Sequence, residues 1–64
     1  MKYFVHDHAL VDPKAKIGVN TRIWAFVNIQ AGALVGEDCN ICDGSFVEKG
    51  AVVGNFVTDR KSVV

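Results

Sequence analysis

The sequence lacks the features on which charge-driven or membrane-spanning proteins depend. Its 64 residues carry seven Lys or Arg against seven Asp or Glu, so the formal net charge is zero, and the basic residues are scattered. A surface for nucleic acid or for an anionic membrane needs clustered Lys and Arg, so neither partner is expected. No apolar run is long enough to cross a bilayer, and the first ten residues do not read as a signal peptide.

Familiar catalytic fingerprints are also missing, and cysteine is rare. The sequence holds no Ser/His/Asp set, no phosphate-binding P-loop and no glycine motif of the dinucleotide-binding kind. Only two cysteines occur. We therefore expect one small domain in a cytoplasmic setting, where both thiols stay reduced.

What the sequence does contain is a six-residue repeat. A β-branched aliphatic residue, here called a rung, recurs at every sixth position, and a small or slim companion follows each rung by four places. Neither the α-helical period of 3.6 nor the strand period of 2 explains this pattern, which is typical of a parallel β-helix. The rungs are Ile17, Ile23, Ile29, Val35, Ile41, Val47 and Val53, the companions are Thr21, Val27, Ala33, Cys39, Ser45, Ala51 and Val57, and the pairs Val5 with Ala9 and Val11 with Ala15 extend the frame backwards.

Three such hexads make one triangular coil of about 18 residues, with a short strand and a turn from each hexad. We predict an all-β fold of about three coils, residues 5–22, 23–40 and 41–58, with rungs and companions pointing inward. Three places after the rungs stand residue types that tolerate the positive φ of a tight turn. These are Asn20, Gly32, Asp38, Gly44 and Gly50, while Lys14, Phe26 and Phe56 occupy the same position and fit it less well.

Stacked coils place the outward residues in columns on three faces. Two columns are partly apolar and one is polar, and exposed apolar columns usually mark an interface. We therefore expect the first two faces to contact other subunits; the alternative is that these are isolated surface aliphatics without a partner. The columns are Leu10, Asn28 and Phe46, then Lys16, Leu34 and Val52, then Arg22, Asn40 and Thr58.

The frame breaks at Asp59, where the next aliphatic is due. Residues 59–64 contain no further hexad and no capping element of the kind that natural solenoids use to cover their last coil. The same six residues are the translation of a common sequencing-adapter sequence. We interpret 59–64 as a non-native tail and expect a β-helix truncated at its C-terminal end, with a short natural protein as the alternative.

A zinc site is one functional candidate. Cys39 and Cys42 form a C-x-x-C pair, and His6 and His8 lie upstream. Cys39 falls in an inward position, and two coil spacings of roughly 9–10 Å separate His6 from Cys42, too far for ligands that each lie about 2.0–2.3 Å from one metal. No helix is expected after Cys39, as thioredoxin-type chemistry would require. We predict no metal site, with structural cysteines and solvated histidines.

The candidate substrate-binding residues are Trp24, Asn28, Phe46 and Glu48. Trp24 falls at a corner of the triangle, and Asn28 points outward on the next strand, one coil before Phe46. Aromatic rings beside an outward amide can line a cleft between subunits for a flat base or sugar ring; the alternative is that they only contact the neighbouring subunit. Glu48 could accept hydrogen bonds from a sugar hydroxyl or amine, or it is a solvated turn residue.

The hexad pattern resembles the transferase hexapeptide repeat, whose family fold is a left-handed parallel β-helix that forms homotrimers. The strings 21–29 (TRIWAFVNI), 39–43 (CNICD) and 46–48 (FVE) are similar to one branch, the bacterial nucleotide-sugar N-acetyltransferases. That branch acetylates the 3-amino group of dTDP-3-amino-3,6-dideoxyhexoses or UDP-2-acetamido-3-amino-uronates for lipopolysaccharide O-antigen and S-layer glycans. The resemblance covers residues 3–58, but only the N-terminal coils of such enzymes, and position 28, often His in relatives, is Asn28 here.

The resemblance implies that an amino-sugar nucleotide binds between neighbouring subunits and that acetyl-CoA lies along later coils. The sugar amine attacks the thioester while the enzyme holds both reactants and stabilises the oxyanion. Because those coils would follow residue 58, we expect the catalytic residues beyond this chain and no activity from the chain alone. Alternatives are another enzyme on this fold (a sugar O-acyltransferase, a serine acetyltransferase or a γ-type carbonic anhydrase) or a non-enzymatic structural solenoid.

Overall fold

The computed structural model describes residues 3–59, and in them ten strands of two residues each alternate with short turns. From β1 to β9, each strand consists of one outward residue followed by one rung. The strands are β1 (Phe4–Val5), β2 (Leu10–Val11), β3 (Lys16–Ile17), β4 (Arg22–Ile23), β5 (Asn28–Ile29), β6 (Leu34–Val35), β7 (Asn40–Ile41), β8 (Phe46–Val47), β9 (Val52–Val53) and β10 (Thr58–Asp59).

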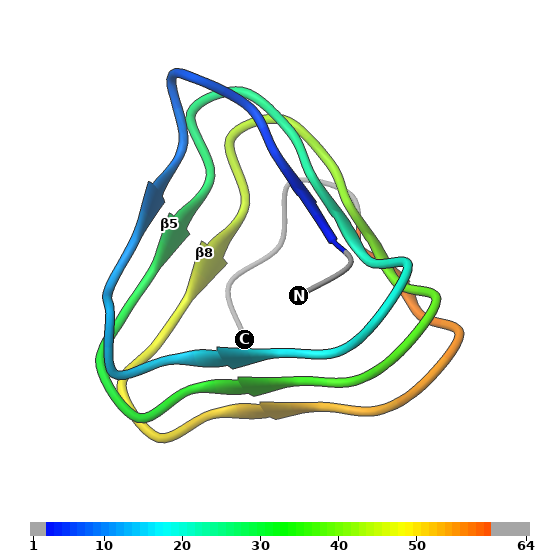
Figure 1. Cartoon of the computed structure of the whole chain (residues 1–64). Helices are drawn as coiled ribbons and strands as arrows, with labels where there is room; N and C mark the ends of the chain where they lie inside the picture. Colours follow the sequence, from blue (N-terminus) through cyan, green and yellow to red (C-terminus); the bar gives the residue numbers. More distant parts are fainter. Residues whose placement is uncertain (1–2, 60–64) are drawn as a thin grey trace.

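These strands form three parallel sheets, one on each side of a triangular prism (Figure 1). Sheet A has the order β1-β4-β7-β10, sheet B the order β2-β5-β8, and sheet C the order β3-β6-β9. Paired residues are 18 apart throughout, as in Arg22 opposite Asn40 and Asn28 opposite Phe46. The predicted parallel β-helix of about three coils is confirmed.

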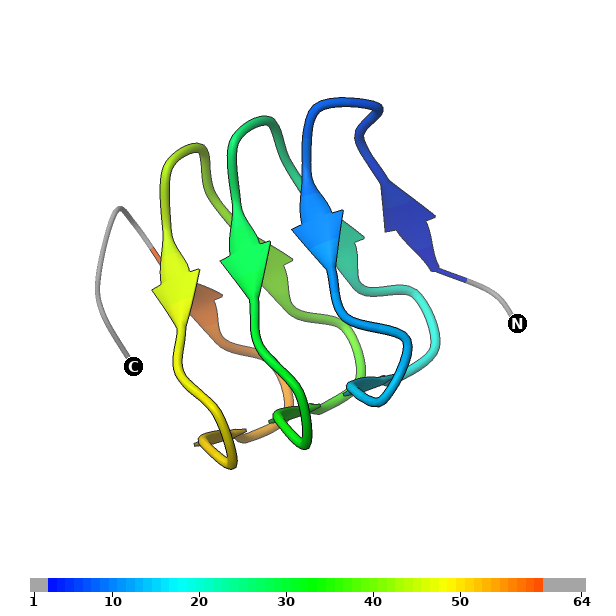
Figure 2. The same cartoon turned by 90° about the vertical axis from the view of Figure 1, so that its left-hand side faces the viewer.

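The coils wind in the left-handed sense that the family resemblance implies. In Figure 1 the N-terminal coil lies nearest the viewer, and the chain runs anticlockwise around the prism as it recedes. Figure 2 shows the same winding from the side, with the strands of sheet B parallel and the coils following one another along the axis. Most parallel crossovers are right-handed, so this fold is one of the exceptions.

Rungs and companions fill the interior, as the hexad frame predicts. The rungs Ile23, Ile41 and Val47 have no exposed surface, whereas Val5 and Val11 in the first coil are only partly buried. Burying such side chains contributes roughly 1.5–3 kcal/mol each to folding. The buried apolar set is Ile17, Ile23, Val27, Ile29, Ala33, Val35, Cys39, Ile41, Val47 and Val53.

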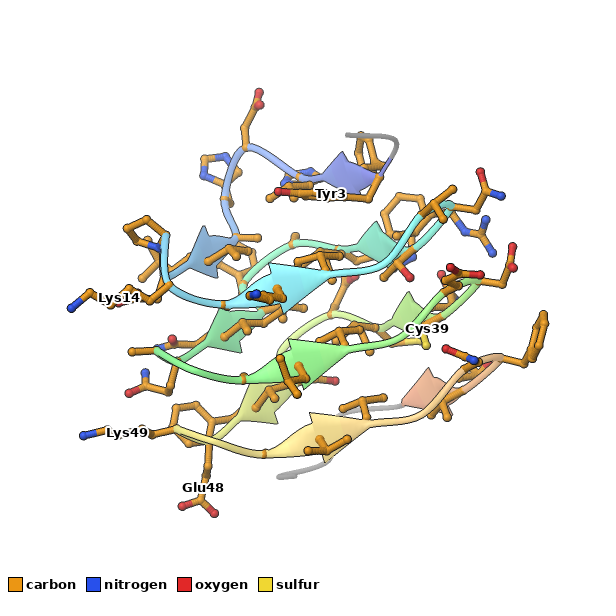
Figure 3. The ribbon with its side chains drawn as sticks, turned by 60° about the horizontal axis from the view of Figure 1, so that its bottom comes forward. Tyr3, Lys14, Cys39, Glu48 and Lys49 are labelled. Atoms are coloured by element: carbon orange, nitrogen blue, oxygen red, sulfur yellow. The ribbon has the colours of Figure 1, made fainter. Side chains whose placement is uncertain are left out.

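One inside corner, between sheets C and A, holds polar companions whose hydrogen bonds link the coils. The hydroxyl of Thr21 donates to the carbonyl of Gly36 at 2.6 Å and accepts the amide N–H of Cys39 at 3.2 Å. The Cys39 thiol donates to the carbonyl of Gly54 at 2.9 Å, and Figure 3 shows its sulfur between the second and third coils. These buried polar groups are therefore paired, as stable interiors require.

The turns explain why two phenylalanines stand where glycine is expected. Phe26 and Phe56 have φ values of 60° and 61°, in the left-handed region that favours glycine. The two residues are 71% and 76% exposed, so burial of their rings does not explain this conformation. In this conformation the N–H of Phe26 donates to the His8 carbonyl and that of Phe56 to the Glu37 carbonyl, each one coil earlier. At these two positions the stack imposes the left-handed turn although the residue is not glycine. Lys14 differs, because its φ is not positive and its N–H bonds the Asp12 carboxylate at 2.8 Å.

Replacing Phe56 by Asn is expected to stabilise the protein by roughly 0.5–1 kcal/mol. A non-glycine residue in the left-handed region costs about 1–2 kcal/mol, and Asn relieves part of that cost because its side chain tolerates this conformation. Little burial is lost, since the Phe56 ring is mostly in solvent. Urea denaturation followed by circular dichroism measures the change. A clear loss of stability in Phe56→Asn would show that the exposed ring makes a contact which outweighs the strain.

The last strand ends one residue later than the predicted end of the repeat at residue 58. Strand β10 continues the frame by one residue, with Asp59 opposite Ile41 in β7. The rest of the predicted non-native tail, residues 60–64, lies outside the described residues. No helix occurs in residues 3–59, and so none there is long and apolar enough to cross a membrane.

Candidate functional site

The outward residues form the predicted columns on the three faces. Leu10, Asn28 and Phe46 lie opposite one another on sheet B. On sheet C, Leu34 and Val52 are 43% and 66% exposed, and Leu10 on sheet B is 69% exposed. Both faces thus present apolar side chains to solvent in this single chain, and their contact with other subunits stays a prediction.

Three of the four candidate residues gather on sheet B and its edge. Asn28 in β5 faces Phe46 in β8, and Glu48 follows two places later at the corner between sheets B and C. The side-chain amide of Gln30 donates to Asn28 Oδ1 at 2.9 Å, and its backbone N–H bonds the Val47 carbonyl at 3.0 Å. Gln30 therefore fixes the orientation of Asn28 beside the coil that carries Glu48.

A shallow depression of about 230 Å³ lies on the same face, along β2 and β5 of the first two coils. Its polar groups are the carboxylate of Asp12 and the amides of Asn28 and Gln30, which suit the hydroxyl and amino groups of a sugar. Glu48 is exposed and points away from the prism, as Lys14 and Lys49 do at the same corner (Figure 3). The lining residues are Leu10, Val11, Asp12, Asn28, Ile29 and Gln30.

Trp24, the fourth candidate, turns to the other side of its corner and lies over sheet A. Its indole Nε1 donates to Asn40 Oδ1 at 2.6 Å, and its ring contacts Phe4 with centroids 5.2 Å apart. The structure therefore does not bring Trp24 together with Asn28 on one surface. The hexad frame places Trp24 at the corner, but it cannot say towards which sheet the indole leans.

Asn40 is a residue that sequence reasoning missed, since it was assigned only to the polar face. Its Oδ1 accepts from Arg22 Nε at 3.4 Å as well as from Trp24, and its Nδ2 donates to Cys42 Sγ at 3.8 Å. The 18-residue register was a usable signal, because it stacks Arg22 on Asn40 and Phe4 on Arg22. The register alone does not reveal that Trp24 is also a partner of Asn40.

The histidines and cysteines do not converge. His6 Nδ1 accepts the backbone N–H of His8 at 3.0 Å, and the His8 ring stacks on Phe26 at 5.6 Å with an interplanar angle of 12°. Cys39 is buried with its thiol bonded to a backbone carbonyl, whereas Cys42 lies at the surface corner. Within residues 3–59 no three His, Cys, Asp or Glu side chains come close enough to hold a metal ion.

Comparisons with known proteins give local matches to two kinds of enzyme. The chain is 62% identical over 39 residues, 61% of its length, to a dTDP-3-amino-3,6-dideoxy-alpha-D-galactopyranose 3-N-acetyltransferase of Aneurinibacillus thermoaerophilus. It is 37% identical over 38 residues, 59% of its length, to an acyl-[acyl-carrier-protein]--UDP-N-acetylglucosamine O-acyltransferase of Brucella ovis. No protein-family model matches.

The matched segments cover only 20% and 14% of these two relatives. Both relatives are hexapeptide-repeat proteins, and both names describe acyl transfer to a nucleotide-linked sugar. The resemblance drawn from the hexads and from the strings 21–29, 39–43 and 46–48 is therefore confirmed, with a short local match as expected for part of a longer enzyme.

Proposed function

We propose that this chain forms the N-terminal coils of an acetyltransferase that moves an acetyl group from acetyl-CoA to the amino group of a nucleotide-linked sugar. The substrate is of the 3-amino-3,6-dideoxyhexose or 3-amino-uronate type and serves surface-polysaccharide synthesis, such as that of lipopolysaccharide O-antigen, in the cytoplasm. The enzyme acts as a homotrimer. The observation that carries this proposal is the 62% identity over 39 residues to an N-acetyltransferase of a dTDP-linked amino sugar.

The sheet B surface supports a sugar-binding role. Asn28 and Gln30 provide amide groups and Asp12 provides a carboxylate in the shallow depression, while Phe46 and Glu48 lie on the next coil, where Phe46 is opposite Asn28. A sugar ring needs such a combination, with an apolar contact for its C–H face and a few polar groups for its hydroxyls. Asn28 and Glu48 then orient the sugar, and a carboxylate near its amine favours the proton transfer that acetylation requires.

Attack on the thioester needs an uncharged amine held close to the acetyl group. Positioning of this kind supplies about 7–11 kcal/mol of the barrier reduction in well-oriented reactions. Acetyl-CoA would bind to coils that follow this chain in the longer enzyme, where the catalytic residues and the oxyanion-stabilising donors also lie. The role of residues 3–58 is then to bind and orient the acceptor.

The second candidate is an O-acyltransferase, which the Brucella ovis relative favours by its name and its 37% identity over 38 residues. The two reactions differ in the acceptor atom, a nitrogen in one and an oxygen in the other. An assay that offers matched amino and hydroxy sugars therefore separates them.

The test is a chimera in which this chain's residues replace the segment of the Aneurinibacillus enzyme that they match. With acetyl-CoA and a dTDP-linked 3-amino-3,6-dideoxyhexose, thiol release is expected within about tenfold of the unaltered enzyme, a difference of about 1.4 kcal/mol in barrier height. The matching 3-hydroxy sugar should give no release, and neither should the 64-residue chain alone. A trimeric chimera that acylates only the hydroxy sugar, or neither sugar, would contradict the proposal.

A further inference from the structure

The shallow depression on sheet B contains one carboxylate and, among the described residues that line it, no Lys or Arg. Asp12 supplies this negative charge. Lys14, the cation closest to it in the sequence, points away from the prism at the corner (Figure 3). A charged group that a ligand brings into the depression therefore meets a carboxylate and no compensating cation of the lining.

The position of the Asp12 carboxylate is fixed by the backbone around it. Its Oδ1 accepts the backbone N–H of Lys14 at 2.8 Å, and its own N–H donates to the Ile29 carbonyl at 2.9 Å. These bonds hold the carboxylate beside β5, where Asn28 and Gln30 complete the polar side of the depression. Asp12 is half-buried there, so solvent and salt screen its charge less than that of a fully exposed residue.

An apolar contact lies beside the carboxylate. Leu10 is exposed and precedes Asp12 by two places, and both residues line the depression from one extended segment. Residues two apart in such a segment lie on the same side, roughly 6–7 Å from each other, a span that a pyranose ring with its substituents can bridge. A methyl group of a sugar would suit Leu10, and an amine or hydroxyl group across the ring would suit Asp12.

We propose that Asp12 is a specificity-determining residue, which restricts the acceptor to 6-deoxy amino sugars and rejects amino-uronates. This inference rests on the proposed function, which allows both types of sugar, and it decides between them. The two types differ at C6, which is a methyl group in the first and a carboxylate in the second. The methyl group packs against Leu10, and the amine or a neighbouring hydroxyl group bonds to Asp12.

A uronate is disfavoured because its carboxylate would enter the same depression as that of Asp12. Two carboxylates that share a site repel each other, and each disfavours the charged form of the other. The amides of Asn28 and Gln30 can donate to a carboxylate, but Gln30 already uses one N–H on Asn28 Oδ1 at 2.9 Å. The donor fork of arginine matches a carboxylate best, and no arginine is among the described lining residues.

The test is a chimera in which residues 3–58 of this chain replace the corresponding coils of the Aneurinibacillus enzyme, so that Asp12 is included. Three dTDP-linked 3-amino sugars are compared, which differ only at C6 and carry a methyl, a carboxylate or a carboxamide group there. The carboxamide has nearly the shape of the carboxylate and no charge. We expect kcat/KM for the carboxylate sugar to be at least about tenfold below that for the carboxamide sugar, with the methyl sugar highest.

Two matched variants isolate the charge. Asp12→Asn removes it and keeps the turn, because an asparagine oxygen can accept the Lys14 N–H in the same way. This variant should reduce the ratio of kcat/KM for the carboxamide and carboxylate sugars by about tenfold. Both sugars carry the same amine, so its own attraction to Asp12 cancels in that ratio. Asp7→Asn, which removes an exposed carboxylate at the corner between β1 and β2, should leave the ratio unchanged.

An equal change of this ratio in both variants would show a general charge effect and overturn the proposal. An unchanged ratio in Asp12→Asn has the same consequence. Circular dichroism checks that both variants keep the fold.

Nuclear magnetic resonance of the isotope-labelled 64-residue chain separates this inference from the proposed function, since it needs no turnover. The methyl glycoside of a 3-amino-3,6-dideoxyhexose should shift the signals of Asp12, Asn28 and Gln30, and the matching uronate should bind at least about tenfold more weakly. A chain that binds neither glycoside, or both equally, overturns the role of Asp12 and leaves the acetyltransferase proposal intact. Selective binding together with a chimera inactive on all amino sugars would exclude the function and leave the selectivity of the depression.

Discussion

Alanine in place of Gly18 is expected to unstack the first two coils and to abolish much of the folded population. A Cβ at this position would lie 2.5 Å from the carbonyl carbon of Gly36, 2.6 Å from its oxygen and 2.7 Å from the nitrogen of Glu37. All three are backbone atoms, so no flexible side chain can move aside. We expect a loss at the upper end of the roughly 1–3 kcal/mol typical of overpacking, a large share of the stability of so small a domain.

Gly54 offers the matched control, since it occupies the same place two coils later, in the third coil. An added Cβ there would meet no atom within 4 Å. Gly54→Ala should therefore change stability by no more than about 0.5 kcal/mol, the usual range for surface substitutions. Urea denaturation followed by far-ultraviolet circular dichroism compares the two variants. Equal stabilities would mean that the coils do not stack at Gly18 as the structure shows.

Ile41→Ala is the second substitution with a large expected effect. Ile41 has no exposed surface and lies in sheet A, where its neighbour on the preceding coil is Ile23. Truncation of a buried isoleucine typically costs about 2–5 kcal/mol, because the surrounding side chains close the cavity only in part. For a three-coil solenoid, in which each coil is supported only by its neighbours, this is enough to unfold the protein.

Val52→Ala is the control for that experiment, because Val52 points outward and is 66% exposed. It should cost no more than about 0.5 kcal/mol. Thermal or urea unfolding of both variants gives the comparison. If Val52→Ala proved as damaging as Ile41→Ala, either the inward and outward positions would be exchanged or sheet C would be covered by another subunit, and sedimentation of the unaltered chain distinguishes the two.

The interior of the fold is readable from the sequence because one periodic signal determines it. Each rung must be aliphatic and each companion small, so the frame from Ile17 to Val53 predicts burial, strand positions and the 18-residue register together. The same frame gives the left-handed turn positions, and it gives them even at Phe26 and Phe56, where the residue type argues against them. At these two positions the hydrogen bond to the preceding coil prevails over local preference.

The outer surface is less predictable, for a physical reason. Whether an outward side chain joins a site depends on single contacts with residues far away in the sequence, and these contacts are not periodic. Trp24 shows this, because its indole leans towards Asn40, 16 residues further along, and not towards Asn28. The corner position was available from the hexads, but the direction of the ring was not. The handedness of the coils could not be predicted from the six-residue spacing either, and was implied only by the family resemblance.

The most direct test of the central claim, that one coil takes 18 residues, is a solution NMR measurement of contacts between strands. Backbone nuclear Overhauser effects are expected between residues 18 apart on each face, as between Arg22 and Asn40, Asn28 and Phe46, and Leu34 and Val52. Cross-peaks whose sequence separation changes along a strand, as in antiparallel hairpins, or continuous runs of cross-peaks between residues three and four apart, as in helices, would contradict the account.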